Sequence, residues 1–189
     1  FAQQAGQLVQ TNRELVEILW LDAAGRLVAS APRQSSPGWE QSEPALTGRL
    51  AVARGSGRGR MTPPFRLGGR GAVAFLAPIS GAAAGDGTLV AVFSLDALLA
   101  QQVPWWIAER RALAISDQGG VTVASRSAVA PEPGAPSYSV EGGAPLEGAR
   151  LVLTSFHDRT SLAHNGVIGA MVALGLFAAA GLVARERQI

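Results

Sequence analysis

The feature that most constrains this chain is an apolar segment close to its C-terminal end. Residues 166–184 read GVIGAMVALGLFAAAGLVA, nineteen residues without a charge, and Arg-Glu-Arg follows directly. At about 1.5 Å per residue, a helix of this length spans roughly 28 Å, close to the ~30 Å hydrocarbon core of a bilayer. The segment is apolar on every face, which suits lipid better than the single stripe of a surface helix. We predict a transmembrane helix over 161–184 and a cytoplasmic juxtamembrane stub over 185–189. The alternative is a buried C-terminal helix of a soluble protein.

Charge alone does not orient the predicted helix, because two arginines lie shortly before it and two lie after it. The chain begins with Phe1 rather than Met and stops five residues past the apolar segment. We therefore expect a membrane helix upstream and a cytoplasmic part downstream. That arrangement anchors the protein in the inner membrane and places residues 1–160 in the periplasm. Small residues four positions apart in the segment allow a second helix to approach, so we expect a homodimer.

The composition excludes several classes of protein. The chain has 189 residues, enough for one ordinary domain or two small ones, and 48% of them are hydrophobic. All 16 basic residues are arginine, and the absence of lysine excludes a P-loop, a Schiff-base enzyme and a lysine base. The absence of cysteine excludes thiol nucleophiles, disulfides and cysteine-ligated zinc. A formal net charge of only +2 argues against a nucleic-acid partner.

The sequence contains no pattern that predicts catalysis, a metal or a cofactor. It has no Gly-x-Ser-x-Gly elbow, and its glycine-rich stretch at 55–59 follows no predicted strand. The two histidines, His157 and His164, have only Asp158 nearby, which is too few ligands for a metal ion. We therefore expect no catalytic residue, no metal site and no cofactor in this chain.

An internal repeat divides the chain into two parts. Residues 18–30 (ILWLDAAGRLVAS) align without gaps to residues 113–125 (LAISDQGGVTVAS). Each copy reads as a β-hairpin in which Asp starts the turn and Gly supplies a positive φ. One interpretation is that tight hairpins converge on this chemistry; the other is two related modules. We predict a stalk helix over 1–12, a membrane-distal module over 13–104 and a reduced membrane-proximal module over 105–160.

The remaining segments predict a mixture of strands and helices. Pro63 and Pro64 keep residues 55–71 from being helical, and we expect this arginine-rich stretch to be a flexible connection. A helix over 96–102 has Ser94 or Asp96 as its N-cap. Further predicted elements are a loop over 31–44, helices over 43–54 and 104–110, and strands over 15–22, 27–30, 72–79, 88–95, 138–141 and 149–156.

Four features in this order resemble the external region of sensor histidine kinases of the C4-dicarboxylate sensor type. They are the first hairpin and three segments that read MTPPF (61–65), GTLVAVFSLDALL (87–99) and VPWWIAERRALAISDQGG (103–120). The resemblance implies an α+β fold of the PAS/Cache type, in which helices lie on one side of a central antiparallel sheet. A second, reduced PAS-like module and the transmembrane helix would follow. The chain carries no kinase core, so kinase activity and a response-regulator partner would belong to the parent protein beyond Ile189.

The resemblance also implies a small organic acid as ligand, bound between the sheet and the loops. An arginine guanidinium offers a carboxylate two parallel hydrogen bonds. Arg58, Arg60 and Arg66 flank the MTPPF segment, and Thr62 within it is a neutral donor. The family's corresponding segment lies near the ligand pocket, which favours Arg60, Thr62 and Arg66. The alternative is a solvated loop in a chain that uses arginine for every positive charge.

Two pairs of aromatic residues lie outside the predicted ligand site. We expect Phe75 and Phe93 to be core residues of the sheet rather than walls of a pocket. Trp105 and Trp106 either form a joint that transmits displacement between the modules or simply pack, and their sequence distance from the apolar segment argues against a membrane contact. Two other functions stay open: a membrane-anchored protein-interaction domain, and the sensor region of a chemoreceptor or a cyclase.

Overall fold

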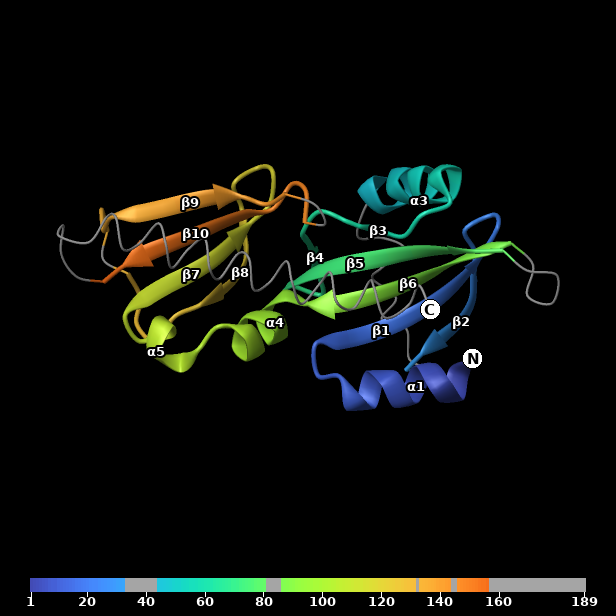
Figure 1. Ribbon diagram of the computed structural model, residues 1–189, viewed down its shortest axis with the longest axis horizontal. Helices are drawn as coiled ribbons and strands as arrows, with labels where there is room; N and C mark the ends of the chain where they lie inside the picture. Colours follow the sequence, from blue (N-terminus) through green and yellow to red (C-terminus); the bar gives the residue numbers. More distant parts are fainter. Residues whose placement is uncertain (33–43, 81–85, 132, 144–145, 157–189) are drawn as a thin grey trace. The chain divides into compact units, whose positions relative to one another are not determined.

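The structure is a computed structural model that describes residues 1–32, 44–80, 86–131, 133–143 and 146–156 (Figure 1). The chain divides into two compact units, Phe1–Ala97 and Leu98–Ile189. No helix among the described residues is long and apolar enough to cross a membrane. The predicted transmembrane segment, both histidines and most of the predicted loop over 31–44 lie outside the described residues.

Unit 1 is built on an antiparallel sheet with the strand order β2-β1-β6-β5-β3, and β4 also pairs with β5. The last helix, α4, begins in this unit and ends in the next. In chain order the elements are α1 (Ala2–Thr11), β1 (Leu15–Asp22), β2 (Leu27–Ala31), α3 (Pro44–Ser56), β3 (Arg60–Met61), β4 (Phe65–Leu67), β5 (Arg70–Ile79), β6 (Gly87–Ser94) and α4 (Leu95–Gln102).

The two faces of this sheet are both covered, each by one helix. Side chains alternate between the faces along a strand, so each face collects its own apolar set. On one face, Leu50 and Ala53 of α3 pack over residues of the sheet such as Leu76, and we call this the α3 face. On the other, Ala5 of α1 packs over residues such as Ile18, and we call this the α1 face. The expectation that helices lie on one side only is therefore wrong, because α1 folds back beneath the strand that follows it (Figure 1).

The predicted first hairpin is confirmed, together with the roles of its turn residues. The carboxylate of Asp22 accepts the backbone N–H of Arg26 at 2.8 Å, and the Arg26 guanidinium also donates to it at 2.8 Å. These two bonds, the backbone one first, lower the pKa of Asp22. Gly25 has a φ of 85°, a conformation that residues with a Cβ rarely adopt. The strands therefore reverse where the sequence predicts.

Unit 2 repeats the same hairpin in a smaller sheet. The carboxylate of Asp117 accepts the backbone N–H of Val121 at 2.9 Å, and Gly120 has a φ of 79°. The antiparallel sheet has the order β8-β7-β10-β9, so β10 lies between two neighbours. The elements are α5 (Trp105–Ala108), β7 (Arg111–Ser116), β8 (Thr122–Arg126), β9 (Ser137–Glu141) and β10 (Arg150–Ser155). Antiparallel sheets with helices are thus the architecture of both units, as the resemblance implies.

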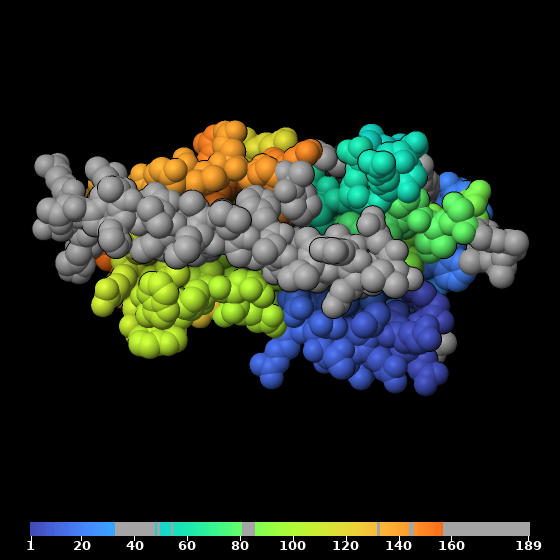
Figure 2. All heavy atoms as spheres, viewed as in Figure 1, coloured from blue at the N-terminus to red at the C-terminus, as the bar shows by residue number. Residues whose placement is uncertain are grey.

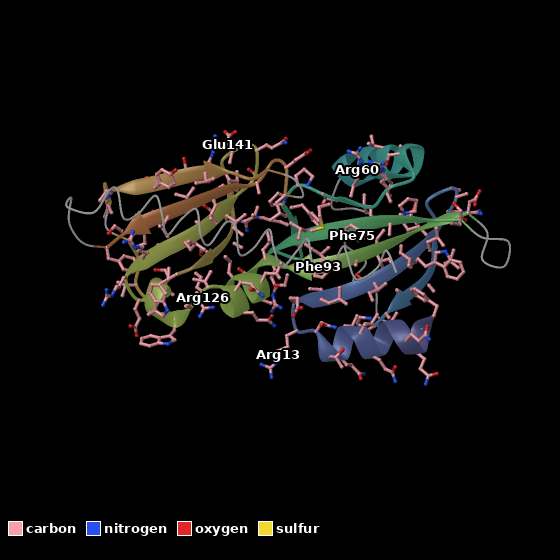
Figure 3. The ribbon with its side chains drawn as sticks, viewed as in Figure 1. Arg13, Arg60, Phe75, Phe93, Arg126 and Glu141 are labelled. Atoms are coloured by element: carbon pink, nitrogen blue, oxygen red, sulfur yellow. The ribbon has the colours of Figure 1, made fainter. Side chains whose placement is uncertain are left out.

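The end of α4 is held by a side chain from the sheet of unit 2. The guanidinium of Arg126 donates to the carbonyl oxygens of Leu99 (2.8 Å) and Ala100 (Figure 3). The last carbonyls of a helix lack intrahelical partners and carry partial negative charge, so a cation there is favourable. At the other end of α4, the Ser94 hydroxyl accepts the N–H of Ala97 at 3.2 Å, which selects Ser94 from the two predicted caps.

The prediction of a flexible connection over residues 55–71 is wrong. The helix α3 continues to Ser56, and the chain then adds two short strands, β3 and β4, to the same edge of β5. Pro63 and Pro64 separate these strands, since a proline has no N–H to give to the ladder. The prolines exclude a helix, as expected, but they interrupt the strand pairing only between β3 and β4.

Candidate functional site

The α3 face of unit 1 receives two of the predicted ligand-binding residues. Arg60 of β3 pairs with Leu76, which belongs to the apolar cluster under α3. Residues directly opposite each other in an antiparallel pair project to the same face, so Arg60 belongs to the α3 face. Its side chain is exposed, and Figure 3 draws Arg60 on the side of the sheet that carries α3. An unburied guanidinium at the edge of this face is free to meet a ligand from solvent.

Thr62 lies at the end of the same short strand and is only 3% exposed. Its backbone N–H donates to the carbonyl of Ala74 at 2.8 Å, and its hydroxyl oxygen accepts the N–H of Ala74 at 2.9 Å. The Thr62 hydroxyl therefore accepts the N–H of Ala74 in place of a backbone carbonyl, at the point where Pro63 ends the strand. Since the oxygen accepts, the hydroxyl proton remains to donate to another group.

The structure does not bring the other two predicted residues to this face. Arg66 of β4 pairs with Gly71 and lies one residue after Phe65, which packs in the cluster under α3. By the alternation of a strand, Arg66 projects to the α1 face, and its guanidinium donates to the Gly69 carbonyl at 3.4 Å. Arg58 is exposed in the connection before β3, where its backbone N–H donates to the Ser56 hydroxyl.

The sequence predictions missed a buried acid on the α3 face. Glu17 of β1 is 3% exposed, and its Oε1 atom has no hydrogen-bond partner. Burial raises the pKa of this carboxyl to about 7, because removal from water disfavours the charged form. The signal that could have found it is a single glutamate inside the otherwise apolar strand LVEILWL.

A β-bulge in β1 places Glu17 on this face. Leu15 pairs with Phe93 and Glu17 pairs with Val92, so the register shifts by one residue between them. Leu15 consequently packs on the α1 face, whereas Val92, opposite Glu17, belongs to the cluster under α3. Strict alternation would have put Leu15 and Glu17 on one face. Bulges are common where a strand must re-aim a side chain near a functional site.

The predicted core role of Phe75 and Phe93 is confirmed. Both rings are partly buried and pack against the apolar cluster of the α1 face, the face opposite to that of Arg60 (Figure 3). A Cβ at Gly59 would lie 2.4 Å from Cζ of Phe75. The absence of a side chain at Gly59 therefore lets the Phe75 ring cover the start of β3.

The two tryptophans of α5 lie on the surface of unit 2. Trp105 is 67% exposed and Trp106 is 48% exposed, whereas Ile107 and Ala108 of the same helix are buried. In the space-filling view, the yellow-green atoms of this region are at the surface (Figure 2). The interpretation that the two indoles simply pack requires them to be buried in the core. Their exposure is against that interpretation. Among the described residues, no cluster of acidic or histidine side chains could hold a metal ion.

Comparison with known proteins gives one curated relative. The chain is 31% identical over 177 residues to the C4-dicarboxylate transport sensor protein DctS of Rhodobacter capsulatus, a match that covers 94% of this chain. The chain spans about a quarter of the length of that protein. No family model matches the sequence.

Solved structures of receptor domains share the fold. The ligand-binding domain of the amino acid chemoreceptor PctC of Pseudomonas aeruginosa PAO1, in complex with GABA, matches with a TM-score of 0.50 and 18% identity, over 80% of this chain and 78% of that one. An extracellular ligand-binding receptor from Desulfohalobium retbaense matches with a TM-score of 0.54 and 14% identity, over 82% of this chain and 32% of that one. The resemblance to sensors of the C4-dicarboxylate type is thus confirmed by homology over nearly the whole chain, and the fold is that of extracellular ligand-binding domains.

Proposed function

We propose that this chain is the extracytoplasmic ligand-sensing and transmembrane signalling region of a two-component sensor histidine kinase. Its ligand is a small organic acid such as a C4-dicarboxylate. The observation that carries the proposal is the homology to DctS, which is named as a sensor of C4-dicarboxylate transport. We assign the kinase core to the part of the parent protein outside this chain, and its partner is a separate cytoplasmic response regulator.

The α3 face supplies the chemistry that this proposal needs. The Arg60 guanidinium gives one carboxylate of the ligand two parallel hydrogen bonds, and the Thr62 hydroxyl gives a third. Thr62 is nearly fully buried and held by two hydrogen bonds to Ala74, so its donor is already oriented before a ligand arrives. A hydrogen bond to a charged group is stronger than one between neutral groups.

Signalling requires that the ligand bind one arrangement of the domain better than another. We propose that residues 161–184 form a membrane helix, that residues 1–160 are periplasmic, and that two copies of the chain associate. The strand β10 is the last described element before the apolar segment, and it connects the sheet of unit 2 to that segment along the chain. A displacement of the sheet therefore reaches the membrane helix through β10.

Calorimetry on the full chain in detergent micelles tests the ligand class. Succinate, fumarate and malate are titrated, with GABA, a zwitterion that has a single carboxylate, as the comparison. We expect a four-carbon diacid to bind, and Arg60→Ala to weaken binding about tenfold to a hundredfold, which corresponds to the roughly 1.5–3 kcal/mol of a charged hydrogen bond. Arg66→Ala is the matched control, because Arg66 projects to the opposite face, and it should leave the affinity unchanged.

Other outcomes would assign other functions. If no diacid binds and a protein partner is retained on the immobilised chain, the chain is a membrane-anchored interaction domain. If GABA binds and the diacids do not, the ligand class is wrong although the chain is a sensor. A chemoreceptor or cyclase output in place of the kinase would be seen in the sequence that follows Ile189 in the parent protein.

A further inference from the structure

The buried carboxyl of Glu17 is not used by the binding chemistry described so far. It is 97% removed from solvent, and its Oε1 atom makes no hydrogen bond. Burying a polar group without a partner costs free energy, and buried polar groups in proteins are nearly always paired. A buried carboxyl with an unpaired oxygen on the face that carries Arg60 and Thr62 therefore points to a partner that arrives from outside the chain.

The register of the sheet gives the relation between this acid and the two donors. Glu17 pairs with Val92, Val92 pairs with Ala74, and Ala74 bonds to Thr62. The four residues form one row across β1, β6, β5 and the strand edge. At 4.7–4.9 Å per strand, the backbones of Glu17 and Thr62 are about 14 Å apart. Arg60 lies on the same face, one row away. Glu17 has a long side chain, and the Thr62 hydroxyl lies toward β5, where it accepts from the Ala74 N–H, so an elongated small molecule can touch both.

The groups around Glu17 favour its uncharged form. Its neighbours on the face, Val92 in the same row and Leu19 in the next, are apolar and almost fully buried. The strands β2 and β6 contain no charged residue, and β4 contributes only Arg66 on the other face. The charged residues of the remaining packed elements are Arg60 on β3, Arg70 at the exposed start of β5, Arg49 and Arg54 in the sequence of α3, and Glu14 just before β1.

This inference rests on the proposed function and deepens it. We propose that Glu17, in its protonated form, donates a hydrogen bond to the second carboxylate of a dicarboxylate whose first carboxylate is held by Arg60 and Thr62. A protonated carboxyl has one O–H to donate, whereas an ionised one can only accept and would repel the ligand. When Glu17 is ionised before binding, it takes one proton from the buffer, and that proton stays in the new hydrogen bond.

The raised pKa of Glu17, about 7, sets the range in which this linkage is measurable. Free carboxylic acids ionise near pH 4 and the second carboxyl of a diacid somewhat higher, so the ligand carries most of its charge at pH 6 and all of it at pH 8. Glu17 changes from mostly protonated to mostly ionised over the same range. We therefore expect the affinity for succinate to be about tenfold weaker at pH 8 than at pH 6, with almost one proton taken up per ligand at pH 8.

The test is calorimetry of succinate binding to the full chain at pH 6, 7 and 8. Each titration is run in phosphate and in imidazole, which both buffer from pH 6 to pH 8, because the difference in heat between the two buffers counts the protons exchanged. Glu17→Gln keeps an N–H donor at the same place, so we expect it to bind succinate equally at all three pH values without proton uptake. Glu17→Leu should bind weakly throughout. Glu109→Gln, an exposed acid in unit 2, should behave like the wild type.

Three results would overturn the inference. Binding that is independent of pH and of Glu17→Gln would show that the carboxyl does not touch the ligand, although the proposed ligand class would stand. Release of a proton instead of uptake, absent from Glu17→Gln, would show that Glu17 ionises when succinate binds and therefore does not donate to the ligand. Absence of succinate binding by the wild type at all three pH values would overturn both this inference and the proposed ligand class.

A second, independent observation concerns the exposed indoles of α5. The backbone N–H of Phe156, the last described residue, donates to the carbonyl of Arg110 at 3.4 Å, and Ser155 pairs with Arg111. The chain thus leaves unit 2 directly beside the end of α5. Gly166, the first residue of the apolar segment, follows Phe156 by ten positions, a reach of at most about 36 Å. Trp105 and Trp106 are far from the apolar segment in the sequence, but the fold brings the strand that leads to that segment next to the end of α5. Sequence distance is therefore no argument against a membrane contact.

The chemistry of this surface matches the headgroup region of a bilayer. Trp105 and Trp106 are exposed, and Arg110 beside them is also exposed. Tryptophan is enriched at membrane interfaces, and arginine pairs with anionic phosphates. Given the membrane helix of the proposed function, we infer that the α5 surface, defined by Trp105, Trp106 and Arg110, rests on the anionic lipid headgroups.

Brominated lipids test this contact, because bromine quenches nearby tryptophans. The full chain is placed in phosphatidylcholine–phosphatidylglycerol vesicles with and without brominated acyl chains. Trp20→Phe/Trp39→Phe leaves only the α5 indoles and should be strongly quenched. Trp105→Phe/Trp106→Phe leaves only the other two and should not. If the chain floats with the vesicles but the two variants are quenched alike, the contact is wrong and the membrane anchor stands. If the chain does not float, both are wrong.

Discussion

Replacing Glu17 by glutamine keeps the size of the side chain and removes its charge. Burial raises the pKa of this carboxyl from 4.5 to about 7. The folded chain therefore holds the proton more tightly than the unfolded chain does, and ionisation of Glu17 opposes folding. Well below pH 4.5, Glu17 is protonated in both the folded and the unfolded chain, and its ionisation does not affect the free energy of unfolding. Between pH 4.5 and about 7, the free energy of unfolding falls as the pH rises. Above about pH 7 it no longer changes with the ionisation of Glu17. The full shift corresponds to about 3 kcal/mol.

Urea unfolding at pH 5 and pH 8 measures this effect. Between these two values, we expect the wild type to lose about 2 kcal/mol of stability relative to Glu17→Gln. Trp20 reports on unit 1 when Trp105 and Trp106 are replaced by phenylalanine in both proteins. Because an amide at this site carries its own cost, the two pH dependences are compared and not the absolute stabilities. Equal pH dependence of the wild type and Glu17→Gln would refute the reasoning.

Three further substitutions test other contacts. Thr62→Val removes the acceptor for the buried N–H of Ala74 and should lower the free energy of unfolding by about 1–3 kcal/mol. Thr62→Ser keeps the hydroxyl and should retain most of the stability. Equal losses for the two variants in urea titrations would contradict the hydrogen bond. Gly59→Ala drives a Cβ into the Phe75 ring and should cost about 1–3 kcal/mol, and Phe75→Leu in the same chain should relieve part of that cost in the same assay. Leu113→Ala, fully buried in unit 2, should cost about 2–5 kcal/mol, read from α5 tryptophan fluorescence.

What the sequence predicts well is what a few neighbouring residues determine. Both hairpins form where Asp and Gly stand three positions apart, because a carboxylate that accepts a backbone N–H and a residue tolerant of positive φ are enough to fix a turn. The helices over 2–11 and 95–102 follow from apolar spacing and from the Ser94 cap. These features need no knowledge of distant parts of the chain.

What the sequence does not predict depends on pairing between distant residues. The strands β3 and β4 are two and three residues long, and they exist because β5 offers them an unpaired edge. The face of Glu17 depends on a bulge that is set by the register with β6. Arg60 and Arg66 look equivalent on either side of MTPPF, and only the register with β5 separates them onto opposite faces.

The position of β10 inside its sheet has a mechanical consequence. It is hydrogen-bonded along six residues to β7 and along five to β9. A force applied along the chain at Phe156 loads these bonds in shear, so many must break together, whereas an edge strand could be peeled away one bond at a time. A force that pulls on the chain beyond Phe156 would therefore move the small sheet as one unit before it extracted the strand, and a tilt of the sheet would be passed on to the end of β10.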